Sequence, residues 1–203
     1  MIGHDVMKIT SAELYGQAFT PDQIPEPDIP QIAVFGRSNV GKSSLLAAMM
    51  QRKKLVKVSS TPGKTRAIFY YVVNDRFLLV DLPGYGFSKA PRAVASQWQS
   101  LVEAYLDSSP GPAVALHLID IRHTPTADDL AVRQILRQRG IPTFTVATKG
   151  DKLSRARRLK SVKVIAGALD VDKSTVIPVS VKDVSIPAQA LWEVVLDNII
   201  VSF

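Results

Sequence analysis

Residues 36–43 read Gly36-Arg37-Ser38-Asn39-Val40-Gly41-Lys42-Ser43, which satisfies the pattern G-x-x-x-x-G-K-[ST]. The apolar run 31–35 before it predicts a strand, and the helical spacing of apolar residues at 45, 46 and 49 predicts a helix after it. In that context the glycines let successive backbone N–H groups converge on phosphate oxygens at a helix N-terminus. Lys42 is expected to reach the β- and γ-phosphates of a nucleoside triphosphate, and the Ser43 hydroxyl to ligate Mg²⁺. The alternative is a tight strand-to-helix turn with a solvated lysine.

The rest of the chain alternates apolar strands with amphipathic helices. Strands are predicted at 31–35, 68–73, 77–80, 113–119, 142–147 and 176–179, and the polar residues 74–76 make the second and third an antiparallel hairpin. Helices are predicted after the loop, and at 94–106, 126–140, 154–169 and 187–201. Such alternation favours a mostly parallel sheet covered on both faces, so we expect a doubly wound α/β fold with ligands at the carboxyl ends of its strands.

Two of these helices carry clear boundary signals. Thr126 can cap the third helix, whose first turn holds Asp128 and Asp129, and Gly140 is expected to end it in a left-handed conformation. Ser154 can cap the fourth helix, which is predicted to turn four apolar residues toward the core: Leu159, Val162, Ala166 and Leu169.

Length and composition indicate one globular domain. Of the 203 residues, 46% are hydrophobic and 21% charged. Residues 1–30 are polar and contain four prolines, so we expect an extended N-terminal lead-in before a single domain at 31–203. The absence of cysteine excludes disulfides and thiol catalysis, and no apolar stretch approaches the roughly 20 residues that span a bilayer. We therefore expect a cytoplasmic protein with no membrane partner.

A second motif, Asp81-Leu82-Pro83-Gly84, follows the predicted strand 77–80. An acid at that strand end can hold a magnesium-bound water, and the Gly84 N–H can meet a γ-phosphate. Taken alone, a D-x-x-G stretch favours a simple β-turn. The upstream phosphate loop reverses that preference.

A third motif, Thr148-Lys149-Gly150-Asp151, ends the predicted strand 142–147. Its carboxylate can accept hydrogen bonds from N1–H and the exocyclic amine of guanine, whereas adenine has no such pair of donors on that edge. The Lys149 stem can cover the face of the base, while the alternative is a charged loop. After the last strand, Val179-Ser180-Val181 lies where a backbone N–H can meet the guanine carbonyl.

These motifs resemble those of the translation-factor-related GTPases, and in particular the EngB/YsxC family of ribosome-biogenesis GTP-binding proteins. The resemblance spans about residues 6–200 and is carried by four strings: 36–44, Thr61-Pro62-Gly63-Lys64-Thr65, Asp81-Leu82-Pro83-Gly84-Tyr85-Gly86 and Thr148-Lys149-Gly150-Asp151-Lys152. It implies a six-stranded, mostly parallel P-loop GTPase domain with one antiparallel hairpin strand. It also implies GTP and GDP as ligands, Mg²⁺ as cofactor, and a role in assembling the large ribosomal subunit, linked to the cell cycle and septation. The expected partner is that subunit or its precursor, through ribosomal RNA and proteins.

The resemblance further assigns a switch segment. Its members, which would contact the γ-phosphate, are Gly63, Lys64, Thr65, Arg66 and Ala67. Thr65 would complete the magnesium shell with Ser43, and Thr61 is the alternative ligand. Family members commonly have two adjacent serines at the guanine-carbonyl element, whereas here Val181 follows Ser180. A backbone contact survives that change.

Tyr85 stands where signalling GTPases have the glutamine that orients the attacking water. Tyrosine has no amide for that task, so we expect slow hydrolysis and interpret Tyr85 as a partly buried packing residue. In related GTPases with a hydrophobic residue there, an asparagine in the place of Asn39 holds a potassium ion against the phosphates. The alternative is that Asn39 only shapes the loop. Lys42, Thr65 and Asn39 are therefore the catalytic candidates.

Two basic clusters lie outside these motifs: Arg52, Lys53, Lys54 and Lys57 after the first helix, and Arg155, Arg157, Arg158, Lys160 and Lys163 along the fourth. A net charge of +7 favours contact with RNA phosphates, while the alternative is a solvated helix face. His117 and His123 are expected at a strand end or in a loop, too far apart for a metal site. The leading hypothesis is a monomeric GTP switch. The alternatives are a ribosome-binding module with negligible turnover and a small P-loop phosphotransferase.

Overall fold

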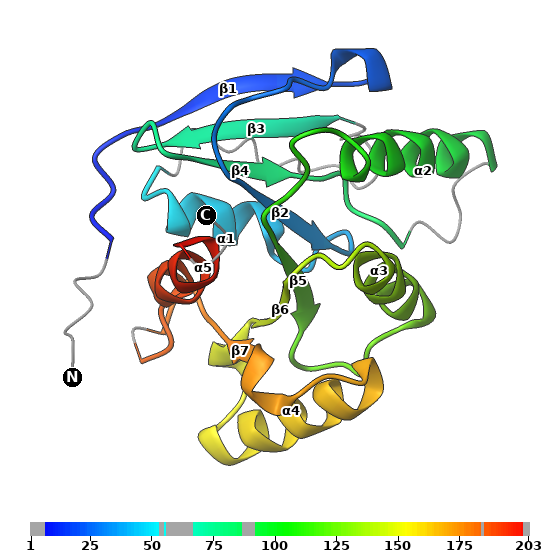
Figure 1. Ribbon diagram of the computed structural model, residues 1–203. Helices are drawn as coiled ribbons and strands as arrows, with labels where there is room; N and C mark the ends of the chain where they lie inside the picture. The colour runs from blue at the N-terminus through cyan, green and yellow to red at the C-terminus, as the bar shows by residue number, and fades with distance from the viewer. Residues whose placement is uncertain (1–6, 53–54, 56–66, 87–91, 184, 201–203) are drawn as a thin grey trace.

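A central sheet organises the computed structural model, which describes residues 7–52, 55, 67–86, 92–183 and 185–200 (Figure 1). Its seven strands lie in the order β1-β3-β4-β2-β5-β6-β7. Their bounds are β1 Ala12–Ala18, β2 Gln31–Gly36, β3 Ile68–Val73, β4 Phe77–Asp81, β5 Val114–Asp120, β6 Thr143–Thr148 and β7 Val176–Pro178. β3 runs antiparallel to both of its neighbours, and every other pairing is parallel. The expected doubly wound α/β fold and its hairpin are confirmed.

Helices cover both faces of this sheet. They are α1 Lys42–Met49, α2 Arg92–Leu106, α3 Ala127–Gln138, α4 Arg155–Leu169 and α5 Leu191–Ile200, with 3-10 turns at η1 Pro21–Gln23, η2 Gly150–Lys152, η3 Lys173–Thr175 and η4 Ala188–Ala190. α1 and α5 pack on one face, where the fully buried Trp192 donates its indole N–H to Met49 O at 3.1 Å. α2 and α3 pack on the other face (Figure 1). None of the helices in the described ranges is long and apolar enough to cross a membrane.

The sheet has seven strands where six were expected. The additional strand, β1, lies in the segment predicted as a lead-in and pairs with β3 from Ala12↔Val73 to Ala18↔Ile68. Only its end residues, Ala12 and Ala18, are buried, and Leu14 and Tyr15 are exposed. The strand therefore lacks the alternation of buried and exposed residues that makes a strand visible in a sequence. It is held at the sheet edge mainly by backbone pairing.

The helix boundary signals are confirmed. Thr126 and Asp129 form a capping box, and Gly140 has φ +66. Of the four α4 residues predicted to face the core, Ala166 and Leu169 are buried and Val162 is partly buried against the same cluster, so only Leu159 departs from the prediction. In α4, Leu159 is 61% exposed, and the buried residues Ile165, Ala166 and Leu169 all lie in the second half of the helix. α4 packs beside β7, which has only three residues, so the sheet edge offers little surface to the first half. His117 also differs from expectation, since it is fully buried in the middle of β5.

Candidate nucleotide-binding site

The carboxyl ends of four parallel strands bring the predicted motifs to one edge of the sheet. The phosphate loop links β2 to α1, residues 82–84 follow β4, residues 148–151 end β6, and residues 179–181 follow β7. Because β2 lies between β4 and β5, and β6 lies between β5 and β7, these loops stand side by side. This is the edge where ligands of doubly wound sheets bind.

The backbone of the phosphate loop has the conformation of an anion cradle. Asn39 has φ +65 and Gly41 has φ +106, so the chain curls through the left-handed region before α1 begins. No side chain caps this end of α1, which leaves first-turn N–H groups for a ligand. A Cβ on Gly36 would lie 2.7 Å from Val40 Cγ1, so only glycine permits this path.

Thr148, at the end of β6, and Lys149, directly after it, stabilise the phosphate loop with hydrogen bonds. The Thr148 hydroxyl donates to Val40 O at 2.8 Å, and Lys149 Nζ donates to Asn39 O at 2.7 Å. The Lys149 stem also passes over Gly41, where a Cβ would lie 3.9 Å from Lys149 Cε. The predicted guanine motif and the phosphate loop are therefore joined directly by two hydrogen bonds.

Lys42 and Asp81 meet at the centre of the site. Lys42 Nζ forms an ion pair with Asp81 Oδ1, and both side chains are largely buried. Gly84 lies against the phosphate loop, since a Cβ there would be 3.0 Å from Ser38 Oγ and 3.2 Å from Ser38 N. The two motifs predicted to share the γ-phosphate are thus adjacent.

Asp151 is oriented by the loop after β7. The Ser180 hydroxyl donates to Asp151 Oδ1 at 2.8 Å and accepts from the N–H groups of Lys182 and Asp183 at 3.0 and 3.1 Å. The hydrogen bond from Ser180 is the main reason that the pKa of Asp151 lies below its ordinary value. The carboxylate is therefore charged and fixed in direction, as a guanine acceptor requires.

Residues 179–181 were predicted to offer a backbone N–H to the guanine carbonyl, and the structure shows which of these N–H groups are already hydrogen-bonded. The N–H groups of Val179 and Ser180 are occupied by Ala147 O and Ile186 O at 2.9 and 2.8 Å. Val181 is 49% exposed, and within the described ranges no acceptor binds its N–H. Among these three residues, Val181 is the one whose backbone N–H has no acceptor in the part of the chain that the structure describes.

Asp120, at the end of β5, was missed by the sequence analysis. Arg122 binds it with two nitrogens at 2.9 and 2.7 Å, and Lys149 Nζ lies 2.9 Å from its Oδ2. Burial alone would raise the pKa of Asp120, but hydrogen bonds from Arg122 and Lys149 outweigh it and hold that pKa well below its ordinary value. A cavity of about 250 Å³ opens here, lined mainly by residues 37–40, 118–120 and 122–124. The signal that could have identified Asp120 in the sequence was an acid directly after the predicted strand 113–119.

The switch segment falls mostly outside the described residues. Thr61, Gly63, Lys64, Thr65 and Arg66 are not described, and neither are the basic residues Lys53, Lys54 and Lys57. Ala67 is described and is buried immediately before β3.

A loop with the geometry of a phosphate cradle and a fixed carboxylate in the predicted guanine motif, on one doubly wound sheet, are the features of a P-loop GTP-binding protein. The 50S ribosome-binding GTPase family matches residues 31–149. The probable GTP-binding protein EngB of Syntrophomonas wolfei is 47% identical over 165 residues, covering 81% of this chain and 86% of that protein. The corresponding protein of Bacillus cytotoxicus is 37% identical over 189 residues, covering 93% and 96%. The chain belongs to the EngB family of GTPases, which hydrolyse GTP to GDP and phosphate.

Solved structures agree with this assignment. The crystal structure of a probable GTP-binding protein EngB covers 83% of this chain and 98% of its own, with a TM-score of 0.68 and 26% identity. Era of Aquifex aeolicus bound to GDP·AlF4⁻ covers 84% of this chain and 56% of its own, with a TM-score of 0.64 and 20% identity. The second likeness concerns the fold alone.

Proposed function

We propose that this protein is a GTP-dependent switch in the assembly of the large ribosomal subunit, acting in the cytoplasm as a monomer. The observation that carries the proposal is the Asp151–Ser180 hydrogen bond, which fixes a carboxylate beside the phosphate loop in a member of a ribosome-binding GTPase family. GTP binding would favour docking on the subunit, and hydrolysis would permit release. The unit that binds is the domain 31–203, to which β1 adds an edge strand.

In this proposal each predicted motif contacts a different part of the nucleotide. Residues 36–43 hold the phosphates, with Lys42 on the β- and γ-phosphates. Residues 63–67 and 81–84 respond to the γ-phosphate. Residues 148–151 select guanine, and residues 179–181 contact its carbonyl, with Val181 as the donor.

Mg²⁺ fits the residues present at the phosphate end. Hydroxyl and carboxylate oxygens are the hard ligands that Mg²⁺ prefers. Ser43 lies in the first turn of α1, and Asp81 already pairs with a cation, the Lys42 ammonium. Ser43 and Thr65 would bind the ion directly, and Asp81 would bind through a water. When bound, Mg²⁺ neutralises charge that develops on the phosphates.

Thr65→Ala tests the switch. Because the threonine would engage the metal mainly when the γ-phosphate is present, the variant should keep GDP affinity and lose the preference for a GTP analogue at saturating Mg²⁺. Thr61→Ala is the matched control and should leave both affinities unchanged. Equal losses for GDP and the analogue in Thr65→Ala would contradict the assignment.

Slow intrinsic turnover is the remaining part of the proposal. Tyr85 has no amide, and its hydroxyl is bound to Asp129 at 2.7 Å, so it is not available to orient water. Turnover by the purified protein, measured with and without large ribosomal subunits, tests this. Stimulation by subunits supports the switch. Undetectable hydrolysis in both conditions would favour a binding module, and phosphate transfer to a small acceptor would favour a phosphotransferase.

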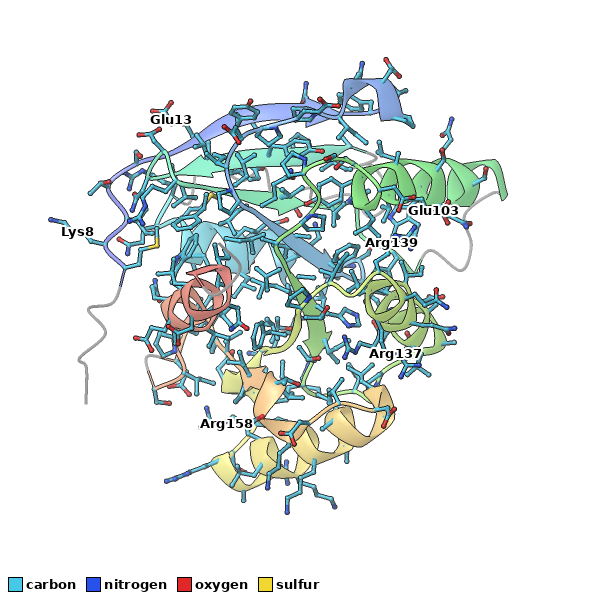
Figure 2. All side chains as sticks on the ribbon, in the orientation of Figure 1. Lys8, Glu13, Glu103, Arg137, Arg139 and Arg158 are labelled. Carbon is cyan, nitrogen blue, oxygen red and sulfur yellow. The ribbon has the colours of Figure 1, made fainter. Side chains whose placement is uncertain are left out.

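The α4 helix supports a ribosomal RNA partner. It contains no acidic residue, and Figure 2 shows nitrogen-tipped side chains projecting from its outer side. Its exposed basic residues are Arg155, Arg157, Lys160 and Lys163, and the partly buried Arg158 pairs with Asp183 at 3.0 Å. Unneutralised cations along one helix suit the RNA phosphate backbone.

A further inference from the structure

The Tyr85 hydroxyl joins three elements of the fold. Tyr85 is 6% exposed and packs edge-on against Trp98 of α2, with ring centroids 6.2 Å apart. Its Oη lies 2.7 Å from His117 Nε2 in β5 and 2.7 Å from Asp129 Oδ1 in the first turn of α3. The expected packing is present, but the hydroxyl also has two specific partners.

These contacts form a directed chain of hydrogen bonds. A carboxylate only accepts, so Tyr85 donates to Asp129 and must accept from His117 Nε2–H. Burial lowers the pKa of His117 to about 4, which keeps the imidazole neutral with its single proton on Nε2. Asp129 Oδ2 in turn accepts from the N–H and the hydroxyl of Thr126, both at 2.7 Å. The chain therefore runs from β5 through Tyr85 to the cap of α3.

The backbone of Tyr85 is paired with the phosphate loop. Ser38 N donates to Tyr85 O at 3.1 Å, and Tyr85 N donates to Gly36 O at 3.4 Å. Gly84 is the preceding residue and lies against Ser38. Displacing Gly84 would move the Tyr85 hydroxyl from its partners and leave polar groups of His117 and Asp129 buried without hydrogen bonds, which is unfavourable.

We propose that Tyr85 is a positioning residue for GTP, whose hydroxyl, held by His117 and Asp129, fixes the Gly84 peptide beside the phosphate loop for contact with the γ-phosphate. The inference rests on the proposed role of Gly84. GDP lacks the γ-phosphate, so this positioning favours GTP over GDP.

Tyr85→Phe tests the inference, because it removes the hydroxyl and keeps the ring. The affinity for a non-hydrolysable GTP analogue should fall roughly five- to tenfold while GDP affinity stays within about twofold. Hydrolysis should lose more in kcat/KM than in kcat, since the lost contact orders the bound state. Tyr105→Phe is the matched control: Tyr105 is fully buried in the same apolar cluster, and its hydroxyl has no partner within the described ranges. It should change neither affinity.

Variants of the partners separate positioning from folding. His117→Leu removes the donor and should reproduce the selective loss of GTP affinity, whereas His117→Gln keeps an N–H and should restore it in part. Thr126→Ala removes one of the two hydrogen bonds that hold Asp129 Oδ2 and keeps the one from the backbone N–H, so it should lower the melting temperature and change the ratio of GTP to GDP affinity less than Tyr85→Phe does.

If Tyr85→Phe loses GTP and GDP affinity equally, the inference is overturned. The same holds if its ratio of GTP to GDP affinity equals that of Tyr105→Phe. If Tyr85→Phe does not fold, the same criteria applied to His117→Leu decide it. A wild-type protein that binds ATP as well as GTP would instead overturn the proposed function.

Discussion

At the scale of single residues, the carboxylate of Asp151, which we propose selects guanine, is held by its neighbours without any ligand. Ser180 donates to Asp151 Oδ1, and two backbone N–H groups fix the Ser180 hydroxyl in turn. The hydrogen bond from Ser180 lowers the pKa of Asp151, so its carboxylate stays charged at neutral pH. Guanine recognition should therefore be present above that lowered pKa and be lost only as the pH falls through it.

Asp151→Asn should weaken GTP and GDP binding roughly ten- to hundredfold and favour xanthine nucleotides. The reason is that the amide presents a donor to the guanine amine, which also donates. Competition titrations with GTP, XTP and ATP measure the change. Asp172→Asn, at an exposed turn before η3, is the control and should keep guanine preference. A variant with unchanged GTP affinity would contradict the assignment of Asp151.

Asn39 provides a second residue-scale prediction, on rate. Its side chain is exposed on the phosphate loop, and its carbonyl oxygen accepts a hydrogen bond from Lys149. Intrinsic hydrolysis should lie within about tenfold of the ~10⁻⁴ s⁻¹ of an unassisted GTPase. Replacing sodium by potassium at constant ionic strength should raise it several-fold, and Asn39→Ala should abolish the difference.

Because Asn39 has φ +65, alanine there also adds backbone strain. Asn39→Gly removes the same side chain and relieves that strain, so it should likewise lose the potassium effect. Equal rates in the two salts for the wild type would exclude potassium and leave the ribosome as the activator.

At the scale of elements, local patterns predicted most of the fold but not its edge. The phosphate loop, the hairpin and the α3 capping box depend on residues close in sequence, and each is present. β1 was missed because its place depends on pairing with β3, whose paired residues are 50 to 61 positions away in the sequence, from Ala18↔Ile68 to Ala12↔Val73. The burial of His117 and the exposure of Leu159 were missed for the same reason: each depends on which element lies opposite. The role of the Tyr85 hydroxyl likewise needs residues from three elements.

Because β1 is part of the sheet, deleting the N-terminal segment that contains it should destabilise the protein. Removing residues 1–18 would expose the backbone edge of β3 and remove the buried side chains of Ala12 and Ala18 from the core. The melting temperature should therefore fall by several degrees, and aggregation should increase. Thermal unfolding and size-exclusion chromatography measure this. Removing only residues 1–6 leaves β1 whole and is the control. An unchanged melting temperature after the longer deletion would mean that β1 does not stabilise the sheet.

At the scale of the whole molecule, α4 is a basic surface, because its 15 residues include five arginines or lysines and no acidic residue. Figure 2 labels Arg158 on α4 at the bottom of the view and Lys8 at the left, on the segment that leads into β1. Replacing Arg155, Arg157, Lys160 and Lys163 by glutamate should weaken binding to the large ribosomal subunit and reduce its salt dependence, because fewer counterions are released. GTP hydrolysis without ribosomes should be unchanged. Lys8→Glu with Arg76→Glu, both exposed residues, controls for charge alone. If this control loses as much affinity per charge, α4 is not the contact surface.

The measurement that tests the proposed switch most directly is co-sedimentation of the purified protein with large ribosomal subunits in the presence of a non-hydrolysable GTP analogue, GDP or no nucleotide. The residues that we propose to meet the γ-phosphate are adjacent, since Lys42 pairs with Asp81 and Gly84 lies against Ser38, so the two nucleotides are expected to affect them differently. We predict that the protein pellets with the subunits in the GTP analogue and stays largely in the supernatant with GDP. Equal pelleting in both nucleotides, or none in either, would contradict a GTP-dependent switch on the ribosome.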